Sequence, residues 1–481
     1  MTPWTRSSAR LFATVVALSV IAAAVAFALG GSGLRPPGRG GAAELLEQRE
    51  TTEARLDATA EAMADGDFDA DRVRTRAADG WLGAQPFGLR AHDWEPAIAA
   101  DPYAPFVYWV STRFDEPKPC PGNCPVPHIA LRVSSDGGGS WSRTRPLCAC
   151  KGSWQYDPII EVVPDTGHVY AIYMNRYNVV FVRSRDHGRT WSAPVETYGN
   201  VSWNDKPALT TSDDGRDVYV TWNGPTGGDP WVAVSHDSGR TWTQTKVVDS
   251  RRYFFAYDGT VLPDGTVVLS QSGIDYSGPA ASAVGEVEQH VFVSRDRGAT
   301  WRDVVVDRVE LGPPCETDGC YADFHSGHSG ISSNAGGRLF HVYDGAVSAG
   351  GPQAIWFRTS SDGGRTWSGR VRLSAPGAHS TGPAIEAAGR RDLRVWFASM
   401  NDRGRWNVFA RRSLDGGASW TSPVKISDTI SGNGYDNAQG FLEFYGDYGE
   451  IAVTNRGRTV ATWGAGFSWL GPGNVWVNVS R

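Results

Sequence analysis

The sequence predicts an all-β fold built from repeated four-stranded antiparallel units. An eight-residue pattern recurs along the chain, strand-like segments precede each copy, and turn residues separate those segments. The pattern, Ser-x-Asp-x-Gly-x-Ser/Thr-Trp, begins at Ser134, Ser184, Ser235, Ser294, Ser360 and Ser413. Its aspartates follow one another at intervals of 50, 51, 59, 66 and 53 residues. Such a period indicates one small supersecondary unit that is stacked repeatedly, as in a propeller or a solenoid.

The chemistry of the pattern predicts a tight turn between two strands. A short acidic side chain can accept hydrogen bonds from backbone N–H groups that a turn leaves unpaired. The glycine two residues later tolerates positive φ, and the hydroxyl residue can tie the turn back on itself. The tryptophan begins the next strand and offers a large apolar face to a neighbouring unit. We therefore expect these octets to be structural.

Each unit carries four short β-branched and aromatic segments. In the third unit these are residues 207–212, 217–223, 231–235 and 242–248, with the octet turn joining the third segment to the fourth. Gly, Asp and Pro separate the segments, which is typical of a four-stranded meander. The same order fits units that begin at Glu95, Pro158, Tyr257, Ser329 and Pro383.

A seventh unit begins at Gly449 and stops at Arg481, before any octet or fourth strand. An unpaired edge invites aggregation, so a radial array must close its last blade. Residues 81–90 precede the first unit and can supply the missing outer strand. The sequence therefore predicts a seven-bladed β-propeller closed by the N-terminal segment, with six blades as the alternative.

Composition narrows the function. The chain has 481 residues with 57 Gly and 20 Trp, which suits many turns and aromatic packing between blades. A net charge of −6 and the lack of a basic run argue against a nucleic-acid partner. We expect a monomer.

The N-terminal region predicts export. Residues 11–29 form an uncharged apolar run behind Arg6 and Arg10, which is typical of a signal peptide or of a single membrane anchor. Residues 26–28 offer a small-x-small cleavage site, whereas the length of the run is enough to tether the chain to a membrane. Residues 30–80 read as a Gly/Pro linker and a helical stalk, and residues 81–481 as the propeller.

Six cysteines fall in three groups, namely Cys120 and Cys124, Cys148 and Cys150, and Cys315 and Cys320. In an exported chain an even number favours disulfides, so we expect the first group to pair with the second and the third to pair internally. A zinc site of four sulfurs at the first two groups is the alternative. The meander places all three groups on the face where the first strand of each unit begins, opposite the octets; we name it the mouth face.

Aromatic and acidic residues recur together just before the first strand of most units, on the mouth face. They are Trp94 and Glu95, Tyr156 and Asp157, Trp203, Asn204 and Asp205, Tyr257 and Asp258, His325 and His328, and Tyr445, Asp447 and Tyr448. Aromatic rings can stack on sugars while carboxylates accept hydroxyl protons, and crowded carboxylates have raised pKa values, as general acids require. Two alternatives remain: the acids cap backbone N–H groups around the channel, or they hold calcium or another hard cation.

Arginines are expected on the same face. They are Arg113, Arg176, Arg251, Arg252, Arg403 and Arg405. Guanidinium groups can clamp the carboxylate of an acidic sugar in bidentate fashion, and the alternative is that they are solvated loop residues.

The six octets resemble the Asp-box, also called the BNR repeat, of sialidases and related propeller proteins. The resemblance covers about residues 80–481. It implies a β-propeller and, in sialidases, hydrolysis of terminal sialic acid by a tyrosine nucleophile, a glutamate, an aspartate acid/base and three arginines. The chain departs from that pattern, since Trp94-Glu95-Pro96 stands where sialidases carry Arg-Ile-Pro, and no arginine triad can be placed.

We expect an exported glycoside hydrolase that acts on terminal sugars, including acidic ones, without a cofactor. Its acid/base candidates are Asp157, Asp205 and Asp447, and its nucleophile candidates are Tyr445 and Tyr448. Its substrate-binding candidates are Trp94, Glu95, Tyr156, Trp203, Asp258, His328, Arg113 and Arg176. The alternative is a non-catalytic propeller that binds glycan or protein at the cell surface.

Overall fold

The fold is seen in a computed structural model, which describes part of the chain. The described residues are 57, 77–88, 93–114, 125–147, 154–201, 203–224, 228–278, 283–313, 327–401, 406–428, 446–466 and 473–481. The predictions for residues 1–29, for the linker and most of the stalk, for all six cysteines and for His325, Arg403, Arg405 and Tyr445 lie outside these ranges. No helix within the ranges is long and apolar enough to cross a membrane.

The described chain is all-β, and five of its sheets have four antiparallel strands each. The first contains β2 (Asp93–Ala100), β3 (Val107–Arg113), β4 (His128–Ser134) and β5 (Arg145–Pro146). The second contains β6 (Gln155–Val162), β7 (Val169–Asn175), β8 (Val179–Ser184) and β9 (Val195–Glu196). The third contains β10 (Asp205–Thr211), β11 (Val218–Asn223), β12 (Pro230–Ser235) and β13 (Thr243–Lys246). Another contains β22 (Ser380–Ala388), β23 (Asp392–Met400), β24 (Trp406–Ser413) and β25 (Val424–Lys425).

The last four-stranded sheet joins the two ends of the described chain. It contains β26 (Glu450–Val453), β27 (Thr459–Gly466), β28 (Gly473–Val479) and β1 (Gln85–Pro86). Gln85 pairs with Val477, and Trp81 forms an isolated bridge to Ser480. The predicted pairing of the segment around residues 81–90 with the C-terminal unit is therefore confirmed.

One further sheet of the described chain has eight strands. It contains β14 (Tyr253–Val261), β15 (Val267–Asp275), β16 (Val284–Ser294), β17 (Arg302–Glu310), β18 (Ser329–Ser333), β19 (Leu339–Ala346), β20 (Gln353–Ser360) and β21 (Val371–Arg372). Its first four strands and its last four each form a meander, and the two meanders are joined by one residue pair, Glu310 with Ala346. This arrangement is consistent with two neighbouring blades.

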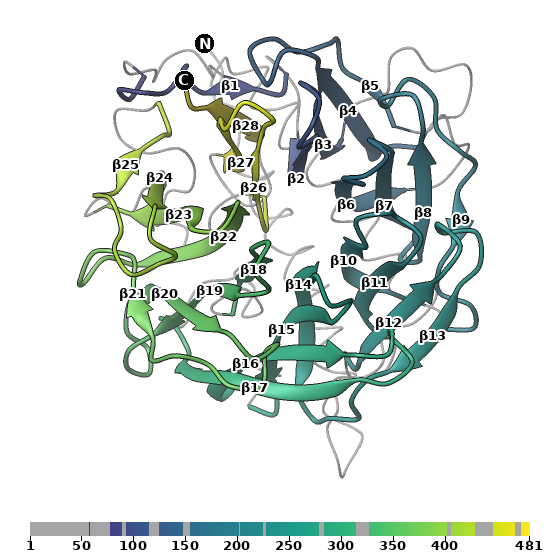
Figure 1. The fold of residues 1–481 in the computed structure, drawn as a ribbon. Coiled ribbons are helices and arrows are strands. Elements are labelled where there is room, and N and C mark those ends of the chain that lie inside the picture. Colours follow the sequence, from purple (N-terminus) through teal and green to yellow (C-terminus); the bar gives the residue numbers. More distant parts are fainter. Residues whose placement is uncertain are drawn as a thin grey trace, which may run out of the picture.

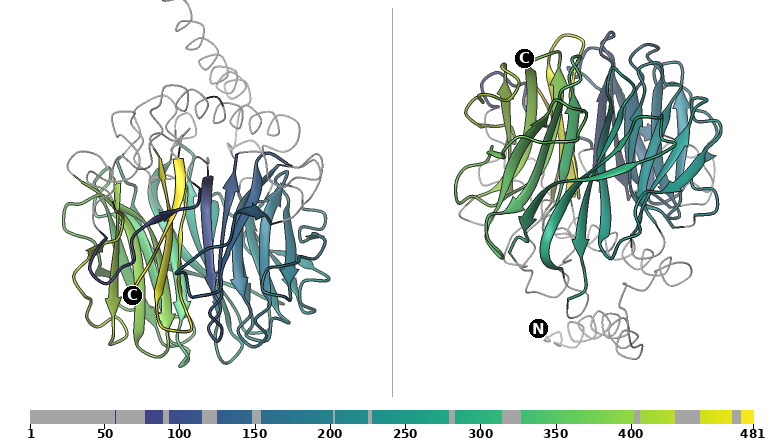
Figure 2. Two further views of the ribbon diagram at one scale, coloured as in Figure 1. Left: turned by 90° about the horizontal axis from the view of Figure 1, so that it is seen from above. Right: turned by 60° about the horizontal axis from the view of Figure 1, so that its bottom comes forward.

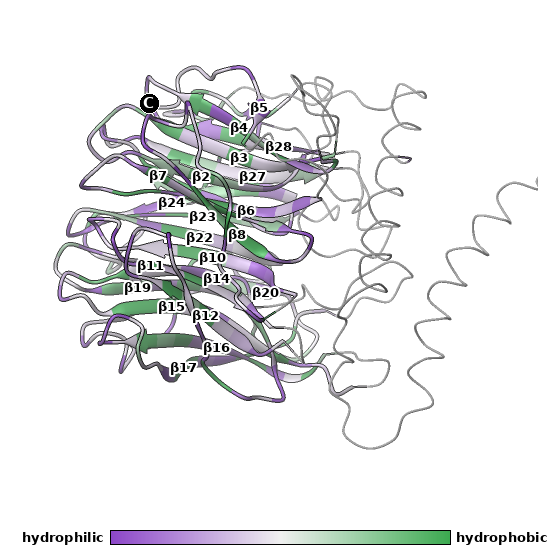
Figure 3. Cartoon of the chain, turned by 90° about the vertical axis from the view of Figure 1, so that its right-hand side faces the viewer, coloured by the Kyte–Doolittle hydropathy of each residue, from purple (hydrophilic) through white to green (hydrophobic). Residues whose placement is uncertain are grey.

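The sheets are arranged around a central axis (Figure 1). The first strand of each meander contacts the first strand of the next, from β2 through β6, β10, β14, β18 and β22 to β26, which contacts β2 again. The views in Figure 2 show the strands running between the two faces of this ring. In Figure 3 hydrophobic colour is concentrated in the strands and hydrophilic colour in the turns. The architecture is therefore consistent with propeller blades that pack their sheets against one another.

The octet turns have the predicted structural role. In the third unit Oδ1 of Asp237 accepts hydrogen bonds from Ser235 Oγ (2.8 Å) and the Thr241 N–H (2.9 Å), while Oδ2 accepts from Thr241 Oγ1 (2.7 Å). The other five octets make the same three bonds. Gly239 adopts φ of +76°, and the Trp242 ring packs edge-on against Phe181 of the preceding unit, with 5.4 Å between centroids. The octets thus close each hairpin and join neighbouring units on the face opposite the mouth face.

Candidate functional site

The mouth-face ends of four first strands share a strained backbone feature. The residue before a proline has positive φ in each of them, at Glu95 (54°), Asp157 (49°), Lys206 (48°) and Gly382 (60°). The strand pairing shifts register at each position. Such bulges re-aim a side chain, and positive φ at residues other than glycine is uncommon and concentrates at functional sites. The inner ring therefore turns two acids and a lysine away from the positions that a regular strand would give them.

A cavity of about 390 Å³ lies inside the ring of first strands and is lined by residues from all seven of them. Its charged and titratable lining residues, within the described chain, are Glu161, Lys206, Asp213, Tyr257, Asp258, His328, Glu386, Asp447, Tyr448 and Glu450. Lys206 is the one lysine in that set, and no arginine belongs to it. The cavity therefore has a strong excess of acidic groups.

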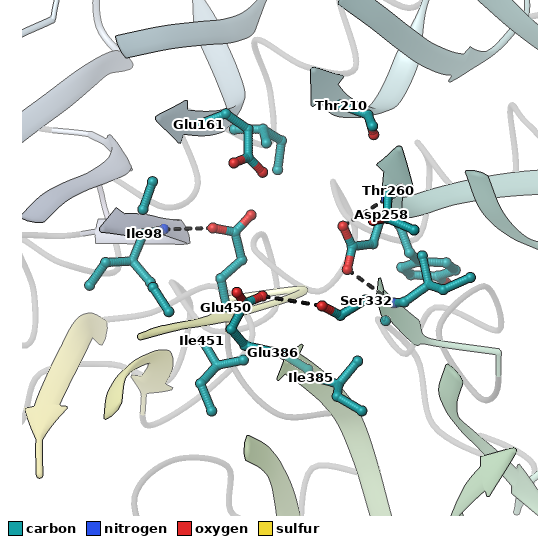
Figure 4. Close-up of a pocket in the computed structure, with 18 of the residues that line it drawn as sticks. Ile98, Glu161, Thr210, Asp258, Thr260, Ser332, Ile385, Glu386, Glu450 and Ile451 are labelled. Atoms are coloured by element: carbon teal, nitrogen blue, oxygen red, sulfur yellow. Dashed lines mark hydrogen bonds between the residues drawn. The ribbon is translucent and has the colours of Figure 1, made fainter. Parts of the chain in front are cut away.

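Four carboxyl groups gather inside the cavity, each from a different first strand (Figure 4). They are Glu161, Asp258, Glu386 and Glu450. Burial raises the pKa of Asp258 to about 7, against hydrogen bonds from the Ile331 and Gly259 N–H groups. Burial and the Asp258 carboxylate raise the pKa of Glu386 to about 8. Burial raises the pKa values of Glu161 and Glu450 well above the usual range, and the other three carboxylates raise that of Glu161 further. Asp258 and Glu386 therefore exchange protons near neutral pH.

Several of these acids also join neighbouring first strands. Oε2 of Glu450 accepts a hydrogen bond from the Ile98 N–H at 2.6 Å, and Oδ2 of Asp258 accepts one from the Ile331 N–H at 3.0 Å. At the mouth, Oε2 of Glu95 accepts from the Asp157 N–H at 2.9 Å. The expectation that acids cap backbone N–H groups around the channel therefore describes these three residues. Both oxygens of Asp258 are thus used, because its Oδ1 accepts from the Gly259 N–H at 2.7 Å.

Lys206 connects two aspartates at the mouth of the cavity. Its Nζ lies 2.7 Å from Oδ2 of Asp447 and 4.0 Å from Oδ1 of Asp157. Asp157 is only 1% exposed, and neither of its carboxyl oxygens accepts a hydrogen bond within the described chain. Burial and the Glu95 carboxylate raise the pKa of Asp157 well above its usual value, against the opposing effect of Lys206. Asp157 thus lies beneath Lys206, whereas Asp447 and Lys206 face the cavity.

The structure brings some of the predicted site residues to the cavity and places others behind it. Asp258, His328, Asp447 and Tyr448 line it. Tyr448 donates a hydrogen bond from its hydroxyl to the Pro158 carbonyl at 3.3 Å, and its pKa is raised well above the usual value by burial and by nearby carboxylates, so it remains a phenol. Asp205 receives a hydrogen bond from the Lys206 N–H, and burial raises its pKa to about 7, but it does not line the cavity.

The predicted aromatic residues divide in the same way. Trp94 and Tyr156 are 2% and 8% exposed and belong to the apolar core between sheets. Trp203 is partly exposed and stacks on Tyr177, with 5.9 Å between ring centroids. Tyr257 lines the cavity beside His328, with 5.6 Å between ring centroids. Of these four rings, Tyr257 is the one that can contact a ligand inside the ring of strands.

The predicted arginines do not converge on the cavity. Arg113 forms a bidentate ion pair with the fully buried Asp93, with both N–O distances 2.8 Å. Arg252 lies 2.9 Å from Glu288, and Arg176 is exposed beyond the end of β7. The described arginines therefore offer no clamp for the carboxylate of an acidic sugar.

Sequence reasoning missed Glu161, Glu386 and Lys206. The two glutamates follow a proline by three residues, in Pro-Ile-Ile-Glu and Pro-Ala-Ile-Glu, and each is the one acid in the apolar part of the first strand that follows the proline. A lone carboxylate at the same register in two repeats is a signal that could have identified the cavity. Lys206 occupies the place before proline that Glu95 and Asp157 occupy in other repeats, which an alignment of the repeats would have shown. No group of three or more His, Cys, Asp or Glu side chains within the described ranges is arranged to hold a metal ion.

Comparison with known proteins confirms the resemblance of the octets. Residues 118–277 match the model of the BNR repeat-like domain. A comparison with curated protein sequences finds no match.

Solved structures with a similar course of the chain include three at low identity. A protein of unknown function from Dyadobacter fermentans is 12% identical, with 84% of this chain and 100% of that chain covered and a TM-score of 0.48. A polysaccharide lyase described as an ulvan lyase is 12% identical, with 80% and 93% covered and a TM-score of 0.48. The intramolecular trans-sialidase from Ruminococcus gnavus is 13% identical, with 81% and 94% covered and a TM-score of 0.41.

Proposed function

We propose that this Asp-box chain is an exported seven-bladed propeller, which binds the end of a neutral or amine-bearing glycan in its cavity and hydrolyses the terminal glycosidic bond. The closed ring of seven first strands supports the blade count, because the eight-stranded sheet divides into two meanders at a single residue pair. The apolar run at residues 11–29 supports export, as a signal peptide or as a membrane tether.

The gathering of carboxyl groups in one cavity is the observation that carries the proposal. A concave site that contains several groups with perturbed pKa values is the first place to look for chemistry. Glycoside hydrolysis needs a carboxylic acid that still holds its proton at the working pH, and a second carboxyl group that is ionised. Asp258 meets the first requirement with a pKa of about 7. Asp447, whose Oδ2 lies 2.7 Å from Nζ of Lys206, is the candidate for the second.

The roles follow from position. Asp258 gives its proton to the leaving glycosidic oxygen. Asp447 takes a proton from the water that attacks the anomeric carbon, so that the new C–O bond forms as the glycosidic bond breaks. Lys206 holds Asp447 in place, with the buried Asp157 behind it. Tyr257 provides a ring face for the sugar. Tyr448 is a hydrogen-bonding phenol in this scheme, and its raised pKa argues against a tyrosinate nucleophile.

Electrostatics supports a neutral or amine-bearing sugar. The cavity lining holds six carboxyl groups against one lysine and one histidine among the described residues. Where these carboxyl groups ionise, a sugar carboxylate would meet charge of its own sign without an arginine to pair with, whereas an amino group would be attracted. The acidic sugars that the resemblance to sialidases implies are therefore not part of this proposal.

A non-catalytic glycan-binding propeller is the second candidate. It is favoured by one observation, namely that Asp258 and Glu450 each use an oxygen to hold a backbone N–H of the next blade. In that case their raised pKa values result from a structural role, and the cavity retains a ligand without turnover.

A panel of 4-methylumbelliferyl glycosides tests the proposal between pH 4 and pH 9. The panel contains glucoside, galactoside, glucosaminide and sialoside, and it is applied to the wild type and to Asp258→Asn. The control is Asp264→Asn, an exposed residue in the β14–β15 turn on the opposite face. We expect release from a neutral or amino sugar that Asp258→Asn lowers about a hundredfold and Asp264→Asn leaves unchanged. If a sugar is retained but no variant releases the fluorophore, the second candidate is supported. If no sugar is retained and none is released, both candidates are refuted.

A further inference from the structure

Asp344 is a buried carboxylate outside the roles described so far. It lies in β19, is fully buried, and accepts hydrogen bonds from the Gly327 N–H (2.6 Å) and the Gly382 N–H (3.1 Å). Thr381 Oγ1 donates to it at 2.5 Å, and His328 Nδ1 lies 3.1 Å from its Oδ2. Burial alone would raise the pKa of Asp344, but His328 and these hydrogen bonds outweigh burial and hold the pKa below its usual value. Asp344 is therefore an ionised carboxylate in the interior.

An ionised carboxylate can only accept hydrogen bonds, so His328 must donate to it through Nδ1. This fixes the tautomer of the neutral ring, in which Nε2 is then an acceptor. The backbone is fixed too, because the Asp344 N–H donates to the His328 carbonyl at 2.9 Å. His328 is thus held at both its ring and its main chain.

Asp344 does not need a histidine beside it to bind the backbone of its neighbours. A carboxylate at Asp344 would satisfy the Gly327 and Gly382 N–H groups without a histidine beside it. A buried histidine of the same sheet, His341, has no carboxylate partner among the described residues, and burial lowers its pKa to about 3. His328 differs because it has an anionic partner and also lines the cavity.

We infer that His328 is a proton-exchanging residue that contacts the ligand in the cavity, and that Asp344 is its positioning residue. The ligand-contacting part of this inference rests on the proposed function. The titratable groups that line the same cavity in the described chain are Tyr257 and Asp258 from β14, Lys206 from β10, Asp213 from the turn after β10, Glu161 from β6, Glu386 from β22, and Asp447, Tyr448 and Glu450 at β26. His328 would accept a hydrogen bond from a ligand hydroxyl when neutral and donate one when protonated.

Chemical modification tests the pair without any glycan. The full chain is treated with diethyl pyrocarbonate, which carbethoxylates neutral imidazole nitrogen, from pH 5.5 to pH 8.5, and each histidine is followed by mass spectrometry. His236, whose side chain is 49% exposed, is the positive control, and the fully buried His341 is the negative control. We expect His328 to react with a titration curve of its own, and Asp344→Asn to lower its apparent pKa by at least about one unit.

Two results would overturn the inference. One is an unreactive His328 in protein whose His236 reacts, which would mean that the ring does not face the cavity. The other is an unchanged His328 titration in Asp344→Asn. Because that variant removes a central acceptor, ring ¹⁵N shifts of the wild type give a second readout: the Nδ1-protonated tautomer is expected, and the Nε2-protonated tautomer contradicts the pairing.

Turnover separates this inference from the proposed function. If the wild type hydrolyses a glycoside of the panel, His328→Gln should lower kcat/KM about a hundredfold and remove one ionisation from the pH profile. An unchanged profile would refute the ligand contact while leaving the hydrolase intact. If no glycoside is bound or released, the proposed function fails and the ligand contact with it, and the modification data still decide whether Asp344 sets the titration of His328.

Discussion

Nζ of Lys206 lies 2.7 Å from Oδ2 of Asp447, although 241 residues separate them in the sequence. Lys206 belongs to β10 and Asp447 precedes β26, so the ion pair reaches across the mouth of the ring. Lys206 also neutralises the buried Asp157 at 4.0 Å, and these aspartates raise its own pKa well above the usual value against the effect of burial. One ammonium therefore balances two carboxylates that would otherwise repel each other.

Replacing this ammonium should destabilise the protein and do so most at high pH. Lys206→Met leaves Asp157 and Asp447 without a cation, which for a largely buried pair costs about 3 kcal/mol. The loss should shrink as the pH falls, because the orphaned carboxyls can then take up protons. Urea unfolding at pH 5 and pH 8 measures it, with Lys206→Arg as the charge-conserving control. An equal loss at both pH values would contradict the electrostatic explanation.

The carboxyls inside the cavity should make the protein less stable as the pH rises. The pKa of Glu386 is about 8 in the folded chain and about 4.3 in an unfolded one. The folded state therefore binds more protons between these values, and its stability is full below about pH 4 and is lost as the pH rises through 8. Glu386→Gln should remove part of this loss, so its Tm should fall less than that of the wild type between pH 5 and pH 9. Glu286→Gln, at an exposed site, should follow the wild type.

The octet glycine should be intolerant of any side chain. A Cβ at Gly239 would lie 2.1 Å from Cε1 of Phe181 in the preceding unit, and its φ is +76°. Gly265 has a similar φ of +83° but nothing within 4 Å of a Cβ. Gly239→Ala should therefore lower the free energy of unfolding by about 2 kcal/mol more than Gly265→Ala, since both share the backbone strain and only the first adds overpacking. Equal losses of unfolding free energy in the two variants would show that the contact between Gly239 and Phe181 relaxes without cost.

The octet aspartate should contribute stability at neutral pH but not in acid. Hydrogen bonds from Thr241, Ser235 and the Arg240 N–H outweigh burial and hold the pKa of Asp237 at about 2. Its contribution is present above the unfolded pKa near 4 and is lost as the pH falls through 2. Asp237→Ala should thus lower unfolding free energy by about 1–2 kcal/mol at pH 7 and by much less at pH 2.5. Chemical denaturation at the two pH values provides the comparison.

The repeat alone was enough to predict the sheets, the octet turns and the pairing of the N-terminal segment with the last unit. These features depend on local chemistry, as in the glycine and aspartate of each turn, and on the need to close an open edge. Two of the acids predicted on the mouth face, Asp258 and Asp447, line the cavity, and their roles stay predictions.

The choice of residues within the site could not be predicted, because it depends on side-chain direction. Trp94 and Tyr156 precede their bulges and turn into the core, whereas Lys206 turns to the cavity. Glu95 and Asp157 have a positive φ like that of Lys206 but do not line the cavity, so the position before the proline does not by itself identify the residue that reaches it. Arg113 could not be distinguished from a ligand clamp until its buried partner Asp93 was seen.

A comparison of the affinities of small sugars tests most directly whether the acidic cavity is the ligand-binding site. Calorimetric titration of the wild type with D-glucosamine, D-glucose and N-acetylneuraminic acid at pH 7 gives the order of affinity. We predict that glucosamine or glucose binds at least about tenfold more tightly than N-acetylneuraminic acid, and that Asp447→Asn weakens that binding. Tighter binding of N-acetylneuraminic acid, or affinities that Asp447→Asn leaves unchanged, would contradict the account.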